Sequence, residues 1–330
     1  MTETETCWAI SDGAAGNERQ VLALARALGH VPHIMRVSLR EPWAMLAPRF
    51  TLGARSAIRV LDGGNLSPPW PSLAIGCGRR AALLTRLLRE WSDGRTTSIQ
   101  ILDPRISSSS FDHVITPQHD AMPGDNVILT IGALNPVDDA WLSEARASYA
   151  HFGDFAGPRH AVLIGASNRA QRIDPEYCRG LVEHCRAMHR NEGGSFLVTV
   201  SRRTSPDVSD FLRSAFAALP GTFCAGADDG HNPYAGILAW ADRLIVTPDS
   251  VNMLSEACAT GRPVWTYAPK PIIGKLAGFH AELIGAGYLR ALGDTHPRPA
   301  IPPLRETAAV AELIQNRRRI ALSDAVSIDR

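Results

Sequence analysis

The chain has 330 residues, 45% of them hydrophobic, and a formal net charge of +1 at pH 7. Its length suits two domains of roughly 150 residues each, and its near-neutral charge argues against nucleic acid as a partner. No apolar run approaches the ~20 residues of a membrane span. The acidic, polar start at Met1–Thr6 is unlike a signal or transit peptide. We therefore expect a cytoplasmic protein without an integral membrane span.

The first half of the chain alternates between short apolar runs and amphipathic segments. Helices are predicted at 17–28, where Val21, Leu24 and Leu28 share one face, and at 79–90. The stretch 41–70 holds Pro, Trp and Gly without clear periodicity, so we expect an irregular or partly helical insert there. Strands are predicted at 7–12, 33–37, 73–75, 98–102, 113–116 and 127–131.

A second alternating series begins near residue 160. It predicts helices at 176–189 and 210–219, and strands at 161–165, 195–200, 244–247 and 264–267. Alternating strands and helices imply parallel sheets with crossover helices. We therefore predict an α/β fold with two Rossmann-like domains, residues 1–150 and 151–305, whose junction falls between Pro136 and Pro158.

The end of the chain, residues 306–330, is predicted to form a helix that returns to the first domain. Its three consecutive arginines, Arg317 to Arg319, form either a solvated face or a peripheral membrane contact. The six cysteines are scattered without the spacing of metal ligands, so we expect buried thiols and predict no metal site. His280, at a predicted helix start, is expected either at a cleft or on the surface.

The most informative segment is Arg243–Trp265, which predicts a strand, a sharp turn, a helix and the next strand. Asp249 and Ser250 are both good N-caps, so the helix begins just beyond the strand's carboxyl end. Backbone N–H groups at a helix N-terminus bind phosphate well, and Glu256, further along, suits hydrogen bonds from sugar hydroxyls. The segment therefore predicts a nucleoside-diphosphate site, with simple capping by Asp249 and Ser250 as the alternative.

The loop Gly165-Ala-Ser-Asn-Arg169 follows the first strand of the second domain. A small residue at Gly165, the Ser167 hydroxyl and the Arg169 guanidinium suit contact with a phosphate at the strand's carboxyl end. An ordinary polar turn is the alternative. The chain contains no Gly-x4-Gly-Lys-Ser segment, so this loop is not a P-loop.

Two further segments of the second domain are predicted to bind the donor. Ser201-Arg-Arg-Thr204 ends a strand, and Arg202 or Arg203 suits neutralisation of a departing diphosphate because arginine makes bidentate contacts. Asn232-Pro-Tyr234 is expected to open a short helix whose backbone brackets the nucleobase. Helix capping by Asn232 alone is the alternative.

In the first domain, Asp12-Gly-Ala-Ala-Gly16 lies between the first strand and the first helix. Gly13 and Gly16 permit positive φ and a close approach of the backbone. Two open-sheet domains would place this loop on the interdomain cleft, where Asp12 acts as a base or orients the acceptor. The alternative is a tight turn in which Asp12 is only a turn former.

The segment Gly76-Cys-Gly-Arg-Arg-Ala81 matches Gly-x-Gly-x-x-Ala between a strand and a helix, and Asp103 ends the following strand. This spacing is typical of a dinucleotide fold, which is the argument for an oxidoreductase. Two arginines crowd the turn, however, where a pyrophosphate needs an open approach. Gly76 and Arg79 suit the acceptor side of a cleft instead, with Arg79 holding an anionic group; a plain turn is the third reading.

Several of these motifs also carry a family resemblance. Asp249-Ser-x5-Glu-Ala-x3-Gly-x-Pro-Val264 resembles the donor-binding motif of GT-B glycosyltransferases. Taken in order with Ser11–Gln20, Ile164–Arg169, Ser201–Thr204 and Asn232–Gly236, it makes the chain similar to the ELM1-like family, named for a plant mitochondrial-fission factor. The resemblance implies a GT-B-like fold, in which two Rossmann-like domains face a cleft.

From these residues and this resemblance we predict a nucleotide-sugar-dependent glycosyltransferase that acts on an unspecified acceptor and uses no cofactor. Asp12, Arg202 and Arg203 are the predicted catalytic residues. Transfer is expected to be independent of metal, because GT-B transfer relies on helix dipoles and basic side chains and the chain has no Asp-x-Asp. The alternatives are a catalytically silent nucleotide-binding scaffold protein and an NAD-dependent oxidoreductase.

Overall fold

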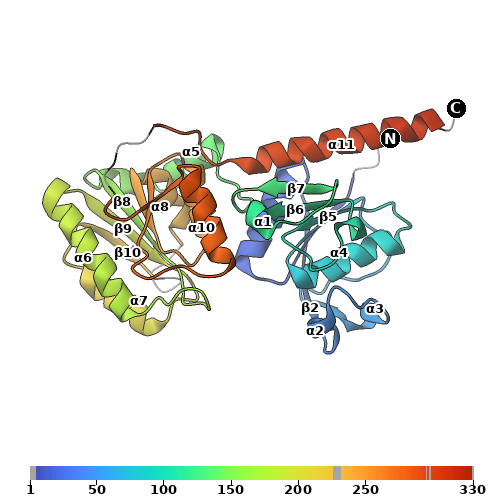
Figure 1. The fold of residues 1–330 in the computed structure, drawn as a ribbon, viewed down its shortest axis with the longest axis horizontal. Helices are drawn as coiled ribbons and strands as arrows, with labels where there is room; N and C mark the ends of the chain where they lie inside the picture. Colours follow the sequence, from blue (N-terminus) through green and yellow to red (C-terminus); the bar gives the residue numbers. More distant parts are fainter. Residues whose placement is uncertain (1–4, 226–231, 295, 297–298, 329–330) are drawn as a thin grey trace. The chain divides into compact units, whose positions relative to one another are not determined.

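The computed structural model describes residues 5–225, 232–294, 296 and 299–328. The chain divides into two compact units: the first comprises Met1–Pro136 and Arg305–Arg330, and the second comprises Val137–Leu304. Each is an α/β unit built on its own sheet (Figure 1). None of the helices in the described ranges combines the length and the apolar character that crossing a bilayer requires.

The first unit is built on a seven-stranded sheet in the order β3-β2-β1-β4-β5-β6-β7. All neighbouring strands run parallel except β3, which pairs antiparallel with β2 at the edge. The order places β1 beside β4, as in doubly wound nucleotide-binding folds. The strands are β1 (Cys7–Ser11), β2 (His33–Leu39), β3 (Ile58–Val60), β4 (Leu73–Cys77), β5 (Thr97–Ile101), β6 (His113–Pro117) and β7 (Val127–Thr130).

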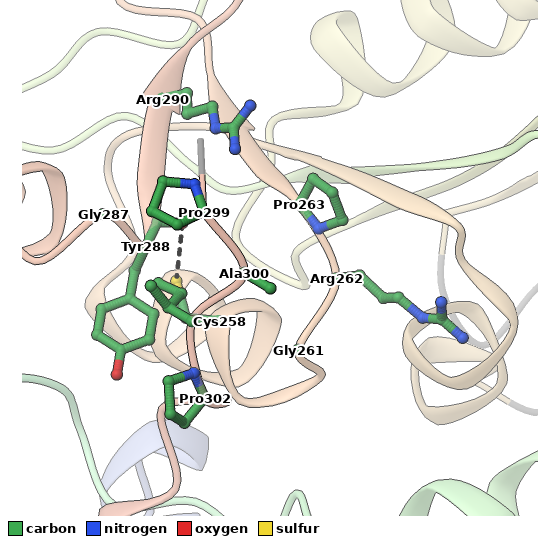
Figure 2. A pocket seen from close by; sticks show the side chains of 11 residues that line it. Cys258, Gly261, Arg262, Pro263, Gly287, Tyr288, Arg290, Pro299, Ala300 and Pro302 are labelled. Atoms are coloured by element: carbon green, nitrogen blue, oxygen red, sulfur yellow. Dashed lines mark hydrogen bonds between the residues drawn. The ribbon is translucent and has the colours of Figure 1, made fainter. Parts of the chain in front are cut away.

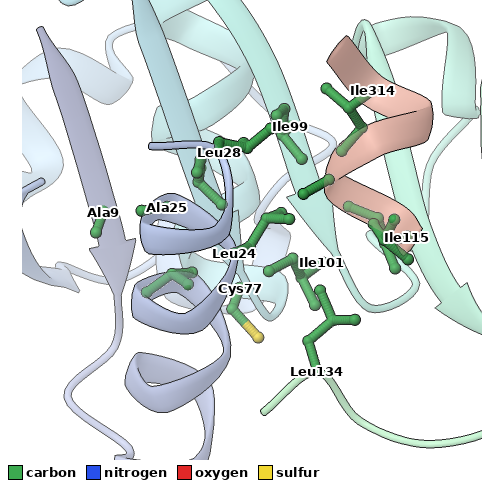
Figure 3. Close-up of a cluster of buried hydrophobic side chains, with 14 of the residues drawn as sticks. Ala9, Leu24, Ala25, Leu28, Cys77, Ile99, Ile101, Ile115, Leu134 and Ile314 are labelled. Atoms are coloured by element: carbon green, nitrogen blue, oxygen red, sulfur yellow. The ribbon is translucent and has the colours of Figure 1, made fainter. Parts of the chain in front are cut away.

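Helices α1 (Ala15–Ala27), α4 (Arg79–Trp91) and α11 (Glu306–Ile328) cover this sheet, and two single-turn helices, α2 (Trp43–Leu46) and α3 (Ala54–Ala57), lie in the insert between β2 and β4. Ile314 of α11 joins Leu24 and Ile115 in a buried cluster (Figure 3). The Glu306 carboxylate also accepts hydrogen bonds from two backbone N–H groups after β7, each at 2.8 Å. The last helix therefore belongs to the first unit.

The second unit has a six-stranded, fully parallel sheet in the order β10-β9-β8-β11-β12-β13. Its strands are β8 (Arg159–Ile164), β9 (Ser195–Val200), β10 (Gly221–Cys224), β11 (Arg243–Val246), β12 (Val264–Thr266) and β13 (Leu289–Ala291). Its helices are α5 (Asp139–Ser148), α6 (Pro175–Glu192), α7 (Pro206–Phe216), α8 (Tyr234–Trp240), α9 (Val251–Ala259) and α10 (Lys275–Gly285). Buried apolar side chains of β8, β9, α6 and α7 form its main core.

The boundary between the units lies at Pro136/Val137, which is at the start of the junction predicted between Pro136 and Pro158 but before the predicted domain bound at residue 150. The difference is helix α5, which packs on α8 in the second unit. Arg146 donates to the backbone oxygen of Ala239 at 2.8 Å, and the Tyr149 ring lies where a side chain at Gly236 would have to be. Three further strands were not predicted, and each is an edge strand of three or four residues: β3, β10 and β13.

Candidate functional site

The strand order of the second sheet reverses between β8 and β11. From β8 the chain builds outward to β9 and β10, and it then crosses to β11, β12 and β13 on the other side. In open α/β sheets, ligands bind beyond the carboxyl ends of the strands at such a switch point. The loops that follow β8 and β11 are two of the segments that the sequence singled out, Gly165–Arg169 and Thr247–Ser250.

The Asp249 carboxylate joins these two loops. One oxygen accepts a hydrogen bond from the N–H of Ala166 at 2.9 Å, and the other accepts from the Thr247 hydroxyl at 2.6 Å. The same hydroxyl oxygen accepts from the N–H of Gly165 at 2.8 Å. Burial raises the pKa of the Asp249 carboxyl, while the hydrogen bonds from Thr247 and Ala166 oppose that rise. Asp249 therefore holds the loops in place with its side chain turned inward.

Gly165 is required by this arrangement. A Cβ atom at this position would lie 2.0 Å from one carboxylate oxygen of Asp249 and 2.3 Å from the other. The backbone of the β8 loop can approach the buried carboxylate only because residue 165 has no side chain. The Thr204 hydroxyl, in the loop after β9, donates to the Gly165 carbonyl at 2.7 Å. Three loops of the sheet's carboxyl edge are thereby tied to one another.

Several predicted ligand groups are engaged in local turns. Ser250 caps α9, with its hydroxyl accepting from the N–H of Met253 at 3.3 Å. The Ser167 hydroxyl closes a loop by bonding both the N–H and the carbonyl of Ile173, each at 2.9 Å. Ser201 accepts from the N–H of Arg203 at 3.2 Å. The side chains of these three serines therefore shape the loops, whereas the predicted arginines of the same loops are solvent-exposed: Arg169, Arg202 and Arg203.

Glu256 and Tyr234 form a direct pair. The Tyr234 hydroxyl donates to the Glu256 carboxylate at 2.5 Å, and Glu256 is only 2% exposed. The start of α8 is fixed from two sides, since the Asn232 side chain accepts from the N–H of Tyr234 at 3.0 Å and the Asn232 carbonyl accepts from the Tyr149 hydroxyl at 2.9 Å. The two predicted segments 232–234 and 249–256 thus meet at a buried carboxylate.

His280 is buried, at 3% exposure, which corrects the sequence expectation of a cleft or surface position. Its Nε2 donates to the carbonyl of Pro248 at 2.8 Å, so it supports the turn that leads into α9 from behind. Burial lowers the pKa of the His280 imidazole. No local sequence signal predicts these contacts. The His280–Pro248 and Thr204–Gly165 bonds join residues that are remote in the chain, and Thr247 lies at an ordinary strand end.

The first unit repeats the same topology, with its strand order reversing between β1 and β4. The Asp12 carboxylate, just after β1, accepts from the N–H of Ala14 at 3.1 Å and from the Asn17 side-chain amide at 3.0 Å. Gly13 is exposed and has φ of +81°, and Gly16 lies in the first turn of α1. Asp12 is therefore held at the carboxyl edge of the first sheet while remaining partly accessible.

The residues around the Gly76–Gly78 turn are occupied by packing. Gly76 lies inside β4, and a Cβ there would be 2.1 Å from the Thr85 hydroxyl, so this glycine allows α4 to approach the sheet. The Arg79 guanidinium donates to the carbonyls of Met45 and Ala44 at 3.2 and 3.0 Å. Asp103 forms an ion pair with Arg105 at 3.2 Å. None of these contacts specifically supports a dinucleotide site at this turn.

A separate cavity of about 250 Å³ lies in the second unit (Figure 2). Its lining includes Arg262, Pro263 and Tyr288, which come just before β12 and β13, together with Cys258 and Arg290. The cavity is thus at the amino edge of these strands, opposite the edge that carries the predicted loops. In the ranges that the structure describes, no three His, Cys, Asp or Glu side chains group as metal ligands, and all six cysteines are buried free thiols.

Two doubly wound units with ordered loops at the carboxyl edges of their sheets define a GT-B-like protein, and solved structures share this fold. A UDP-GlcNAc 2-epimerase from Methanocaldococcus jannaschii superposes with a TM-score of 0.58 at 11% identity, covering 95% of this chain and 100% of that one. MurG of Acinetobacter baumannii gives 0.50 at 14% identity over 95% and 100% of the chains. At such identities the likeness concerns the fold alone.

The sequence relatives are more specific. The family model described as "Mitochondrial fission ELM1" matches residues 15–318. The mitochondrial fission protein ELM1 of Arabidopsis thaliana is 30% identical, with 94% of this chain and 90% of that protein covered. An uncharacterized protein of Rickettsia prowazekii is 25% identical over 93% and 97% of the two chains. The chain belongs to the mitochondrial fission ELM1 family.

Proposed function

We propose that the second unit binds a nucleoside-diphosphate sugar at the carboxyl edge of its sheet and that the protein transfers the glycosyl group without a metal ion. The observation that carries the proposal is the joining of the loops after β8, β9 and β11 around Asp249 and Gly165. These contacts fix the N-terminus of α9 and the exposed arginines of two loops at one edge of the sheet. Such an edge suits a diphosphate because both features favour negative charge.

Within this site the roles divide by chemistry. The N-terminus of α9, beginning at Ser250, and Arg202 or Arg203 stabilise the diphosphate as it leaves. The Glu256 carboxylate accepts hydrogen bonds from the ribose hydroxyls, in exchange for or alongside the Tyr234 hydroxyl that it now binds. The Asn232–Tyr234 turn brackets the base. A solved structure of the Methanocaldococcus jannaschii UDP-GlcNAc 2-epimerase, which shares the fold, is a complex with UDP-GlcNAc and UDP, so uridine nucleotides are the first candidates.

The acceptor is assigned to the first unit. Asp12 follows β1 at the strand-order reversal, and its carboxylate is oriented by Asn17 and the N–H of Ala14. A carboxylate held in this way can orient or deprotonate an acceptor hydroxyl, a contribution of ~10²–10⁴ in rate. We also propose that the protein acts in the cytoplasm.

A second candidate is a nucleotide-binding scaffold without turnover. The Arabidopsis relative is described as a mitochondrial fission protein rather than as an enzyme, which favours this alternative. Both candidates require nucleotide binding by the second unit, and they differ only in whether a bound nucleotide sugar is consumed.

The test is a thermal-shift panel of nucleoside diphosphates and nucleotide sugars, followed by calorimetry. A true ligand at 100 times its dissociation constant should stabilise the protein by ~2.7 kcal/mol. Glu256→Gln should weaken binding by roughly tenfold or more, because a hydrogen bond to a charged group is lost. Glu183→Gln is the matched control, since Glu183 is an exposed α6 carboxylate paired only with Arg186 among the contacts described.

If no nucleotide binds at millimolar concentration, both candidates fail. If the Glu256 and Glu183 variants bind equally well, Glu256 is not part of the site. Incubation of the wild-type protein with the tightest nucleotide sugar, with release of the free nucleoside diphosphate as the readout, then separates the transferase from the scaffold.

A further inference from the structure

A short segment of the first unit exposes an unusual concentration of large apolar side chains. Residues 43–53, here called the apolar loop, comprise α2 and the turn that follows it. Four side chains within eight residues are exposed: Met45 at 73%, Leu46 at 44%, Phe50 at 41% and Leu52 at 77%. Within the first unit, the loop lies on the side away from α11 (Figure 1).

The apolar loop is folded around the side chain of Trp43. The indole N–H of Trp43 donates to the Leu52 carbonyl at 3.1 Å, and its ring lies 6.2 Å from that of Phe50. Ala44 and Ala47 face the interior and are buried. Ala44, Ala47 and Trp43 therefore anchor the loop, and its exposed side chains stay on the outside.

The backbone polar groups of the loop are largely satisfied within the protein. Five N–H groups of the loop donate to carbonyls of residues 42–46: those of Met45, Leu46, Ala47, Arg49 and Phe50. The carbonyls of Ala44 and Met45 accept from Arg79, and that of Pro48 accepts from Arg86. Entry into a medium of low dielectric therefore costs few unmade backbone hydrogen bonds, which is the condition that a lipid environment imposes.

The surroundings of the loop are positively charged. Residues 40–61 contain four arginines and one glutamate, which gives +3, whereas the whole chain has +1. Arg40 and Arg49 are exposed beside the apolar side chains. Helix α4 adds Arg79 and Arg86 at the base of the loop, where they bind its carbonyls, and Arg80 beside them; of these, Arg86 is paired with Glu90.

We propose that the apolar loop docks the protein onto an anionic lipid bilayer. Met45 and Leu52 enter the boundary between headgroups and acyl chains, and the exposed Arg40 and Arg49 contact lipid phosphates. This goes beyond the proposed glycosyl transfer and does not depend on it. It differs from the membrane contact that was one of two alternatives for Arg317 to Arg319 of α11, where Arg318 is paired with Glu5 and Arg319 with Asn316.

A bilayer fits this surface better than a protein partner for two reasons. The backbone of the loop is largely satisfied by the loop and by Arg79 and Arg86, so it offers few hydrogen-bond groups to a protein partner, whereas lipid requires none. The combination of outward apolar side chains with a basic margin matches the layering of a membrane, in which an anionic headgroup zone covers hydrocarbon.

The test is flotation of the full chain with vesicles of phosphatidylcholine alone or rich in phosphatidylglycerol. Wild-type protein should bind the anionic vesicles, and added salt should weaken the binding because the arginine contacts are screened. The double variant Met45→Ser, Leu52→Ser should lose roughly tenfold or more of the affinity for each side chain withdrawn from the interface. Arg49→Glu should lose about fivefold or more, because one favourable contact is replaced by repulsion.

Matched controls exist in the same unit. Leu129→Ser changes a leucine that is 50% exposed on β7, and Arg26→Glu changes an exposed arginine at the end of α1. Both should bind like wild type, and all variants should melt like wild type because the altered side chains are exposed.

The proposal is overturned if the wild-type chain does not float with anionic vesicles at low salt, or if the loop variants float as well as the controls. Equal binding to both vesicle types would show that the arginines do not contribute to lipid binding. A concentration-dependent dimer that the double variant abolishes, without vesicle binding, would assign the loop to a second copy of the chain instead.

Discussion

Replacing Gly165 with alanine is the sharpest perturbation of the candidate site. The added methyl would lie 2.0 and 2.3 Å from the two carboxylate oxygens of Asp249, whereas an ordinary contact begins near 3.4 Å. The carboxylate must therefore move by more than 1 Å. That movement breaks its bonds to the N–H of Ala166 and to the Thr247 hydroxyl, at 2.9 and 2.6 Å.

The size of the effect follows from these two bonds. A hydrogen bond to a charged group contributes about 1.5 kcal/mol or more, so Gly165→Ala should cost about 3 kcal/mol. For a unit of this size, one kcal/mol lowers the melting temperature by about 2–4 °C, so a decrease of about 6–12 °C is expected. Thermal unfolding followed by far-UV circular dichroism measures it.

Two comparisons make the result specific. Gly285→Ala, at the end of α10 with no atom within 4 Å of the new methyl, should be neutral or slightly stabilising. In an Asp249→Ala background the clash is absent, so Gly165→Ala should then cost less than about 1 kcal/mol. If Gly165→Ala melts like wild type, or if its cost is unchanged when Asp249 is removed, the proposed joining of the loops is wrong.

Three further predictions concern catalysis and pH. Asp12→Asn should keep nucleotide affinity while turnover falls by ~10²–10⁴; a parallel loss of binding in calorimetry would make Asp12 structural. Turnover should survive chelation by EDTA, and activity that disappears and returns with Mg²⁺ or Mn²⁺ would contradict metal-independent transfer. Burial lowers the pKa of His113, His160 and His280 below their usual 6.5. The unfolded state therefore takes up these protons first, so stability should be complete above about pH 6.5 and decline as pH falls, by up to about 1.4 kcal/mol per pH unit for each histidine. Urea titrations at pH 7 and pH 5 measure this, and equal or greater stability at pH 5 would refute it.

The sequence predicted the elements that carry strong local signals. The strands nearest the two switch points are apolar runs ended by turn residues, and helices such as α4 and α6 have clear apolar faces, so both Rossmann-like sheets could be recognised. Helix α5 escaped notice because its buried side chains are only Leu142 and Ala145, although Asp138 caps it through the N–H of Trp141 at 2.7 Å. The antiparallel strand β3 was hidden in an insert without periodicity.

The candidate site was predictable as a set of segments but not as a set of contacts. Gly, Ser, Asp and Arg residues after the predicted strands indicated the loops. The loops after β8, β9 and β11 lie together because they follow strands that end at the same edge of the sheet. The inward use of Asp249 was not foreseen. Its bond to Ala166 spans 83 residues and results from the pairing of β8 with β11, and the nearby Thr247 does not by itself indicate a buried carboxylate. His280 reaches Pro248 across 32 residues, which no sequence pattern records.

We propose that the carboxyl edge of the second sheet binds a nucleoside diphosphate. Hydrogen–deuterium exchange with and without saturating UDP tests it most directly, because each segment reports separately. We predict slower exchange in residues 165–169, 201–204 and 249–256, with no change in residues 76–82. Protection confined to residues 76–82, or bound UDP that protects none of the three loops, would contradict the account.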